Sequence, residues 1–460
     1  MEKTKMSGQK MDMLHGPIWN KIIQYAIPVA ATGILEQLFN ASDIAVVGNF
    51  TGEAKTVAVA AVGANSPIVG LILNLFIGIA LGANVVIANA VGKKDEDTIH
   101  KAVHTSVIMS VIGGLLVMAL GEALIPYLLQ MLNVPQDVFP YALLYIRIYL
   151  LGMPVILLYN FEAAIFRSVG ETKTPLKALA VSGVLNVLLN LFFVIVLKMT
   201  VNGVAVATVI SNAISSMILF FKLLRTDSVI RIQISSLKFH KDVFMKIMRI
   251  GLPAGIQSAV FAVANIVIQA AINSLGTVVI AASSAAFNIE IFVYDILNAF
   301  SQACTTFTGQ NYGAGDFKRC KKVLALCIAE DAVAVAASVT LVLLLGKNLL
   351  AIFNNDSQVV EIGYIRLLMI FSAYAFSMLY ENMSGYLRGF GISFVPAILT
   401  IIGVCGTRIL WICTVFPTHR TFSAIMAAYP VSLSITAVLI FIAVMVYRPS
   451  HKLRGEAGEK

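Results

Sequence analysis

Long apolar segments recur along the whole chain and restrict its fold more than any other feature of the sequence. Twelve of them can cross a bilayer, since a helix of about 20 residues spans a hydrocarbon core of roughly 30 Å. Their approximate positions are 18–49, 57–91, 99–124, 137–166, 175–198, 203–225, 243–275, 277–310, 320–346, 357–387, 393–416 and 421–447. Only 12% of the residues are charged and the mean hydropathy is +0.86, whereas soluble domains carry about one quarter charged residues. The sequence therefore predicts an all-α integral membrane protein with twelve transmembrane helices and excludes a soluble globular domain.

Lysine and arginine are distributed unequally between the two sides of these helices. With twelve spans both termini lie on one side, and 26 of the 33 Lys and Arg residues fall in the termini and loops of that side, against four in the opposite loops. Because basic loops stay in the cytoplasm, we expect both termini to be cytoplasmic and the protein to lie in the inner (plasma) membrane of the cell. Topology then explains the formal net charge of +9, and we expect no nucleic-acid partner.

The two halves of the chain resemble each other at a nearly constant offset. The segment YNFEAAIFRSVGETKTP, residues 159–175, aligns with YENMSGYLRGFGISFVP, residues 380–396, which begins 221 positions later. The identical pairs are Tyr159/Tyr380, Arg167/Arg388, Gly170/Gly391 and Pro175/Pro396. Six spans per half, an even number, relate the halves by an axis along the membrane normal. We therefore expect two pseudo-symmetric six-helix lobes around a central cavity: an N-lobe (1–225), a cytoplasmic linker (226–242) and a C-lobe (243–460).

The order of these features resembles a known transporter family. The residues that carry the resemblance are Pro28, Asp43, Val47 and Gly48, which read "P…D-x-x-x-V-G" in the first span, and Gly92 and Asp95, which read "G-x-x-D" after the second. With these residues, essentially the whole chain resembles the bacterial type of the MATE (multidrug and toxic compound extrusion) family. The resemblance implies a multidrug exporter, not an enzyme, in which H+ or Na+ enters as organic, often cationic, compounds leave. It implies no cofactor beyond the coupling ion, and a monomer whose partners are small lipophilic cations and membrane lipids.

A polar stripe on the first span marks a candidate ion site. Glu36, Asn40 and Asp43 are spaced i, i+4, i+7 and share one helix face, and an ionisable side chain there needs protein, water or a cation as a partner. The residues to which the resemblance assigns cation coupling are Asp43, Asn186, Asn190 and Thr208. Asn190 departs from the family pattern, which has an acid there, so the site holds one charge, and H+ and Na+ both remain candidates. We expect Glu36 to be a second ionisable site.

The eighth span, which contains FNIEIFVYDILNAFSQA, supplies a candidate substrate site. Asp295 and Asn298 share one helix face, whereas Glu290 points about 140° away from Asp295. An acid in this span of related exporters is similar in placement to Glu290, and we expect Glu290 or Asp295 to attract a lipophilic cation by charge and cation–π interaction. The full expected set is Glu290, Asp295, Tyr294, Phe287 and Asn298, with Tyr159, Glu162 and Glu381 from the fourth and tenth spans. Arg408, within the eleventh span, is expected to pair with Glu381 or Asp295.

Two other functions are compatible with a polytopic helical fold. A flippase for lipid-linked precursors belongs to the same superfamily, but the intramembrane acids outnumber the bases, which argues against a cavity for anionic headgroups. A membrane-embedded enzyme requires clustered His, Asp, Ser or metal ligands, and His100 and His104, spaced i, i+4, stand without such neighbours in sequence. The sequence contains no C-x-x-C pair and no G-x-x-x-x-G-K-[ST] loop, so we expect neither a metal centre nor a bound nucleotide.

Overall fold

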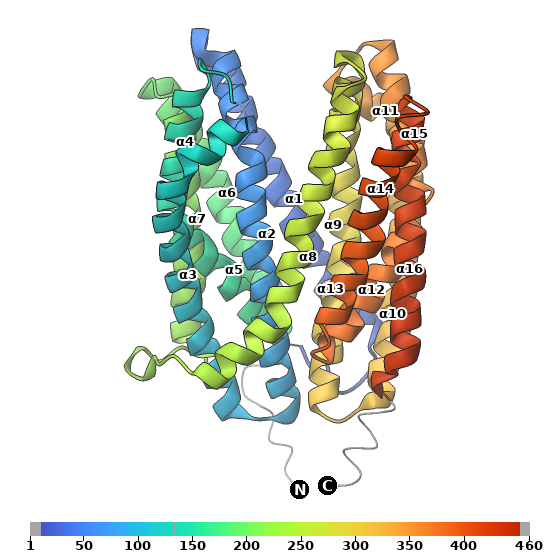
Figure 1. The fold of residues 1–460 in the computed structure, drawn as a ribbon. Coiled ribbons are helices and arrows are strands. Elements are labelled where there is room, and N and C mark those ends of the chain that lie inside the picture. The colour runs from blue at the N-terminus through green and yellow to red at the C-terminus, as the bar shows by residue number, and fades with distance from the viewer. Residues whose placement is uncertain (1–10, 133, 451–460) are drawn as a thin grey trace, which may run out of the picture. The chain divides into compact units, whose positions relative to one another are not determined.

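Helices make up the fold of the protein (Figure 1). The computed structural model describes residues 11–132 and 134–450, and within them there is no β-strand. This follows from the apolar segments, because in lipid only a helix or a closed barrel satisfies all backbone N–H and C=O groups. Among the described residues ten helices are long and apolar enough to cross a membrane, or twelve if each of two bent pairs is one span. The prediction of an all-α membrane protein is confirmed.

Sixteen α-helices and four short segments of other helix types follow one another along the described chain. The α-helices are α1 (Trp19–Phe50), α2 (Lys55–Lys93), α3 (Glu96–Met131), α4 (Phe139–Leu151), α5 (Met153–Ser168), α6 (Lys173–Leu191), α7 (Val201–Arg225), α8 (Lys241–Asn273), α9 (Thr277–Gly313), α10 (Phe317–Phe353), α11 (Ser357–Phe371), α12 (Tyr374–Gly389), α13 (Phe394–Thr400), α14 (Thr407–Thr414), α15 (Phe422–Met426) and α16 (Ala428–Tyr447). The short segments are the 3₁₀ turns η1 (Gly52–Ala54) and η3 (Ile234–Ser236) and the π-helical segments η2 (Phe192–Val196) and η4 (Ile401–Gly406).

Two of the predicted spans are bent rather than straight. The segment expected at 137–166 forms α4 and α5, which meet at an angle of 52°, and α11 and α12 meet at 46°. Gly152 occupies the first bend, where a Cβ would lie 2.5 Å from the side chain of Val209. Pro154 follows in the first turn of α5, where its missing N–H leaves no helical hydrogen bond unmade.

Equivalent helices in the two halves begin and end in the same way. The carboxylates of Asp95 and Asp316, 221 positions apart, cap α3 and α10 by accepting from the backbone N–H three residues later, at 3.0 and 2.9 Å. Gly170 and Gly391, also 221 positions apart, have φ values of 81° and 80° just beyond α5 and α12. Glycine tolerates this left-handed conformation, which closes a helix C-terminus. The internal repeat is thus visible in backbone geometry as well as in sequence.

Two compact units are distinguished by the contacts within the chain. Among the described residues, unit 1 consists of Met11, 31–87 and 95–248, and unit 2 consists of 12–30, 88–94 and 249–450. The start of α1 and the end of α2 thus group with the second half of the chain. The lobe boundaries expected from sequence place both segments in the N-lobe. The lobe and linker boundaries expected from sequence stay a prediction.

Each unit has an apolar core and apolar outer faces. Leu129 and Ile146 in unit 1, and Ile272 and Leu350 in unit 2, are completely buried. In contrast, side chains such as Leu120 on α3 are 61% exposed. Lipid tails are as apolar as leucine, so such faces are at no disadvantage in a bilayer.

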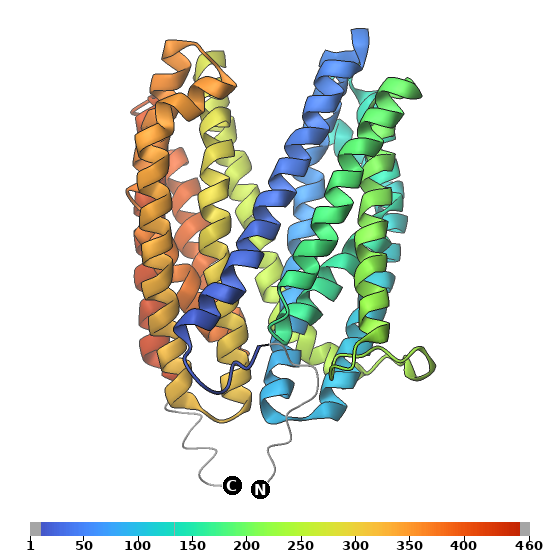
Figure 2. The same ribbon diagram turned by 180° about the vertical axis from the view of Figure 1, so that it is seen from behind.

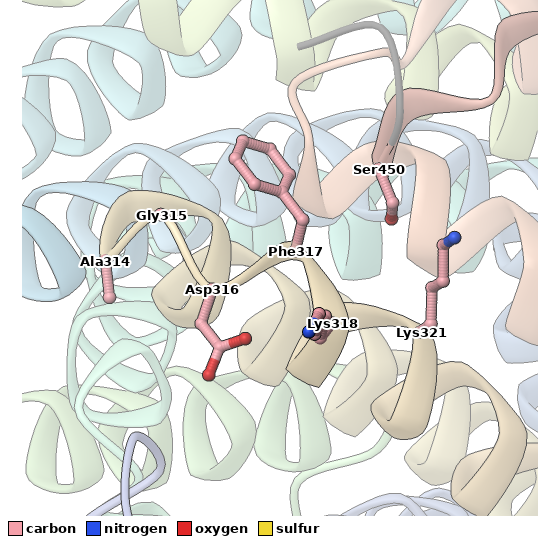
Figure 3. Close-up of a pocket in the computed structure, with 7 residues that line it drawn as sticks. All are labelled: Ala314, Gly315, Asp316, Phe317, Lys318, Lys321 and Ser450. Atoms are coloured by element: carbon pink, nitrogen blue, oxygen red, sulfur yellow. The ribbon is translucent and has the colours of Figure 1, made fainter. Parts of the chain in front are cut away.

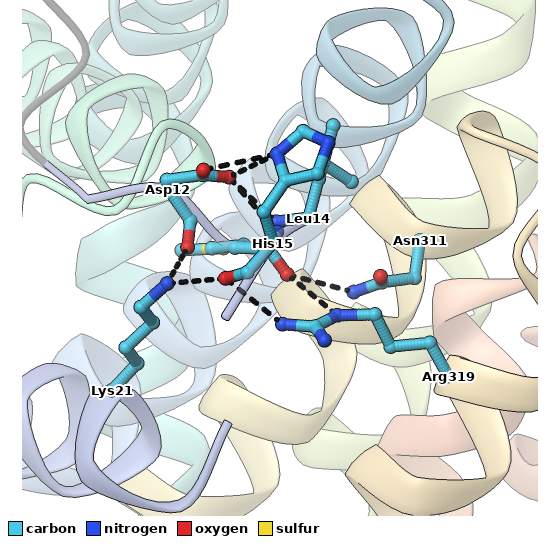
Figure 4. Close-up of polar contacts among 7 residues, drawn as sticks. Asp12, Leu14, His15, Lys21, Asn311 and Arg319 are labelled. Atoms are coloured by element: carbon cyan, nitrogen blue, oxygen red, sulfur yellow. Dashed lines mark hydrogen bonds and ion pairs between the residues drawn. The ribbon is translucent and has the colours of Figure 1, made fainter. Parts of the chain in front are cut away.

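The segment before α1 is held against the start of α10 within unit 2 (Figures 2 and 4). Arg319 donates to the carbonyl of Met13 from Nε at 3.2 Å and to that of His15 from Nη2 at 3.3 Å. Lys21 Nζ donates to the carbonyls of Asp12 and His15, each at 2.5 Å. Burial raises the pKa of the Asp12 carboxyl, but hydrogen bonds from the following backbone N–H groups and the His15 ring outweigh it, so this pKa lies below its usual value.

Candidate functional site

Hydrogen bonds join Asp43 of α1 to α6 and α7 within unit 1. Asn190 Nδ2 donates to Asp43 Oδ1 at 2.6 Å, and Thr208 Oγ1 donates to Asp43 Oδ2 at 3.1 Å. Asp43 is only 6% exposed. Each carboxylate oxygen therefore has a neutral donor in place, which offsets part of the cost of burying the charge.

Asn186 completes this cluster of four residues. Its Oδ1 accepts from Asn190 Nδ2 at 3.2 Å, and its Nδ2 donates to Thr208 Oγ1 at 3.5 Å. The Oδ1 atom of Asn190 is buried and has no hydrogen-bond partner within the described residues. The cluster thus offers several oxygens and one negative charge, a set that suits a proton or a small hard cation. The structure brings together all four residues expected at the coupling site, and their role in coupling stays a prediction.

Close packing of α6 on α1 positions these groups. A Cβ on Gly183 would lie 1.8 Å from ring carbons of Phe39, so the absence of a side chain at this position lets the two helices approach. Immediately after α6 the chain enters the π-helical segment η2, and π-helical turns frequently accompany functional sites. Gly183 lies outside the set predicted from sequence, although its place three residues before Asn186 is a usable signal.

The other acids of unit 1 lie apart from this cluster. Glu36 is exposed and is not part of the hydrogen bonds around Asp43. Glu162 is fully buried and accepts from Ser216 Oγ at 3.0 Å. Tyr159 is also buried, and its hydroxyl has no hydrogen-bond partner within 11–132 and 134–450. The roles expected for Glu36, Glu162 and Tyr159 stay predictions.

Glu290 of α9 is paired with Arg366 of α11 in unit 2. Arg366 donates to Glu290 Oε2 from Nη2 at 2.9 Å and from Nε at 3.3 Å. Arg366 Nη1 also donates to Ser283 Oγ at 2.8 Å, and the ring of Phe287 lies 5.6 Å from this guanidinium. The two charged side chains are only 13% and 4% exposed. Glu290 is therefore already neutralised by a base that helix spacing did not reveal as its partner.

The remaining candidates of unit 2 lie on α9 and α12. The half-buried ones on α9 are Tyr294, Asp295 and Asn298. Glu381 of α12 is 6% exposed, and its Oε2 lies 4.0 Å from Arg388 Nη1. Arg388 Nη2 in turn donates to Gln257 at 3.2 Å. The expected pairing of Arg408 with Glu381 or Asp295 is not found, because within the described chain no carboxylate oxygen lies within 4.0 Å of the Arg408 guanidinium.

A further buried acid, Asp331 of α10, lies outside the set predicted from sequence. Its Oδ2 accepts from Asn382 Nδ2 at 2.6 Å, and both residues are completely buried. An acidic residue within an apolar span is the signal that marked Asp43. The same signal is present here, because Glu330 and Asp331 lie within the apolar span expected at 320–346.

One surface pocket, of about 300 Å³, lies at the turn between α9 and α10 (Figure 3). Its lining residues are Ala314, Gly315, Asp316, Phe317, Lys318, Lys321 and Ser450. None of the residues predicted to bind ion or substrate is among them. This pocket is therefore separate from the candidate sites described above.

Comparisons with known proteins agree with this architecture. A family model described as MatE matches residues 28–192 and 253–414, one range in each half of the chain. The chain is 23% identical to "Probable multidrug resistance protein YoeA" of Bacillus subtilis, over 92% of this chain and 93% of that protein. It is 21% identical to "Multidrug export protein MepA" of Staphylococcus saprophyticus, over 90% and 94%.

A solved structure has the same fold. It is described as the outward-facing conformation of a multidrug resistance MATE family transporter of the MOP superfamily, and it matches with a TM-score of 0.88 at 21% identity over 97% of this chain and 98% of that one. The predicted fold class of twelve helices in two lobes is confirmed by this match. The chain therefore belongs to the MatE family of multi-pass membrane transporters.

Proposed function

We propose that this chain is a secondary active exporter that moves small organic compounds out of the cell against H+ or Na+ by alternating access. The observation that carries the proposal is the buried cluster of Asp43, Asn186, Asn190 and Thr208, which has one charge and neutral oxygens around it. A group of this kind can be neutralised and released by a single small cation. The names of the relatives, which are multidrug resistance and export proteins, support a broad range of substrates.

Ion binding at Asp43 is expected to change how α1 contacts α6 and α7. A proton or sodium ion on the carboxylate takes the place of the donors Asn190 and Thr208, so the hydrogen bonds between these helices must rearrange. Pro28 interrupts the hydrogen-bond ladder of α1 and permits this helix to bend. Occupancy of the carboxylate thus gives a physical route from ion binding to a change in helix packing.

The cellular setting follows from charge and composition. The bias of Lys and Arg supports a plasma-membrane location with cytoplasmic termini, and the apolar outer faces support direct contact with lipid. Both repeats lie in one chain, which supports a monomer. Exposed Glu36 supports the predicted preference for lipophilic cations, whereas the Glu290–Arg366 pair does not.

The test is transport by the purified full chain in sealed phospholipid vesicles. Ethidium movement is followed by fluorescence under an imposed pH gradient, and separately under a sodium gradient at constant pH, with protein-free vesicles as the control. We expect one of the two gradients to drive ethidium movement against its concentration gradient. Absence of movement under both gradients, with protein shown to be folded, overturns the proposal.

A further inference from the structure

Arg408 of α14 is a buried base in unit 2. The residue is 3% exposed, its Nε donates to Ser432 Oγ of α16 at 3.1 Å, and its Nη1 donates to Asn265 Oδ1 of α8 at 3.4 Å. A guanidinium carries five N–H groups, and these two bonds are its only hydrogen bonds to the described residues. Donors therefore remain for a further acceptor.

The charges around Arg408 do not balance. Its guanidinium carbon lies 4.1 Å from the centre of the Tyr429 ring, and that of Arg366 lies 5.7 Å from the same centre. Glu290 is bonded to Arg366, and in residues 11–132 and 134–450 no carboxylate comes within 4.0 Å of Arg408. Two bases around one tyrosine thus share a single acid. An uncompensated buried charge is costly in a membrane protein and generally marks a ligand site.

Arg408 and its hydrogen-bond partners lie on the three spans of their half that are equivalent to the spans carrying the ion cluster in the other half. Asp43, Asn190 and Thr208 lie on the first, fifth and sixth spans of the repeat. Asn265, Arg408 and Ser432 lie 222, 218 and 224 positions later, on the equivalent spans. Each set of three is joined by hydrogen bonds to its central charged group. The charged group is therefore an acid on the first span in one half, whereas in the other half it is a base on the span equivalent to the fifth.

The helix that carries Arg408 is irregular at this point. The π-helical segment η4 ends just before α14, and Gly403 within it is packed so closely that a Cβ would lie 2.3 Å from Thr436 Oγ1. α14 and α16 lie side by side in unit 2 (Figure 1). Directly after this segment, the Arg408 guanidinium contacts Ser432 of α16 on one side and, on the other, half-buried Asn265 and Phe261 of α8.

We propose that Arg408, with Asn265, Phe261 and Tyr429, binds the anionic group of an aromatic organic compound. The free N–H groups of the guanidinium suit the two oxygens of a carboxylate or phosphate. The rings of Phe261 and Tyr429, 5.2 and 4.1 Å from the guanidinium carbon, supply aromatic surface beside that anion. Transport of such a compound rests on the proposed export function, but its binding at Arg408 does not.

The test measures binding without any ion gradient, so a failed export function does not affect it. The full chain is placed in phosphatidylcholine nanodiscs and titrated with 2-naphthoate, its neutral amide and 2-naphthylmethylammonium in equilibrium dialysis. We expect 2-naphthoate to bind about tenfold more tightly than the amide, because a bond to a charged group is worth more than a neutral one. Arg408→Gln removes that preference and Arg408→Lys keeps part of it. Arg147→Gln, at an exposed arginine of unit 1, retains it in full.

Equal affinity for naphthoate and amide, tighter binding of the ammonium, or an unchanged preference in Arg408→Gln overturns the proposal. If Arg408→Gln does not fold, the three ligands on the wild type and Arg408→Lys decide. Adding phosphatidylglycerol to the nanodiscs separates two sources of the anion. Competition of phosphatidylglycerol with naphthoate in the wild type alone identifies a lipid headgroup as the anion and overturns the assignment to an aromatic compound, whereas an unchanged naphthoate affinity supports that assignment.

Discussion

Asp43→Asn tests the proposed ion site most directly. The substitution keeps the shape of the side chain, but it removes the one charge of a cluster whose other members, Asn186, Asn190 and Thr208, are neutral. Two unit charges about 4 Å apart attract by about 4 kcal/mol at an effective dielectric constant of about 20. At about 1.4 kcal/mol per tenfold change in affinity, a sodium ion loses about a thousandfold in affinity. A proton loses its binding site altogether, because the amide of an asparagine does not take up a proton at physiological pH.

The assay is ethidium transport by vesicles containing the variant, measured against the concentration of the driving ion. We expect no ion-dependent transport in Asp43→Asn at concentrations that saturate the wild type. Glu122→Gln serves as the matched control, because Glu122 is an acid of the same unit that pairs with Arg147 and takes no part in the hydrogen bonds of the cluster. Thermal unfolding confirms that both variants are folded. An ion dependence within about threefold of the wild type, far from the thousandfold worked out above, would refute the argument.

Three further predictions concern the buried charges and the packing around them. Glu290→Gln leaves Arg366 buried without its acid and should lower stability by about 3–5 kcal/mol, and the double variant Glu290→Gln/Arg366→Gln should recover much of this loss in thermal unfolding; a double variant no more stable than the single one contradicts the pairing. Gly183→Leu should destabilise by about 1–3 kcal/mol through overpacking and impair transport, whereas Gly63→Ala, where a Cβ meets nothing within 4 Å, should do neither. Asn190→Asp adds a second acid and, if Na+ is the driving ion, should lower the half-saturating Na+ concentration by about tenfold or more; an unchanged value would place the sodium site elsewhere.

Hydropathy was sufficient to predict an all-α membrane fold, whereas the membership of the ion cluster came from helix spacing together with the resemblance to a known family. The apolar spans require helices, and spacing along α1 and α6 decides which polar residues share a face. With the resemblance of the first span to a known family, this was enough to group Asp43, Asn186, Asn190 and Thr208. The hydrogen bonds between α1, α6 and α7 agree with that grouping.

Contacts between helices that are distant in sequence could not be predicted in the same way. Spacing does not state which faces of two helices meet. The pairing of Glu290 with Arg366, and the lack of a described carboxylate beside Arg408, therefore required the structure. Hydropathy likewise does not give the size of a bend, such as the 52° between α4 and α5 within a continuous apolar span. Asp331 is a different case, since its position within an apolar span was visible in the sequence.

The direction in which the Arg408 side chain points depends on the number of residues in the π-helical segment η4. A π turn holds more residues than an α turn, so deleting one residue within Ile401–Gly406 would allow a regular α-helix with every backbone bond retained. Each residue of an α-helix turns the chain by about 100°, so the same deletion would rotate Arg408 away from Asn265 and Ser432 relative to the preceding segment. In an alignment of similar chains, a one-residue gap within this segment would mark those in which the equivalent arginine does not face α8.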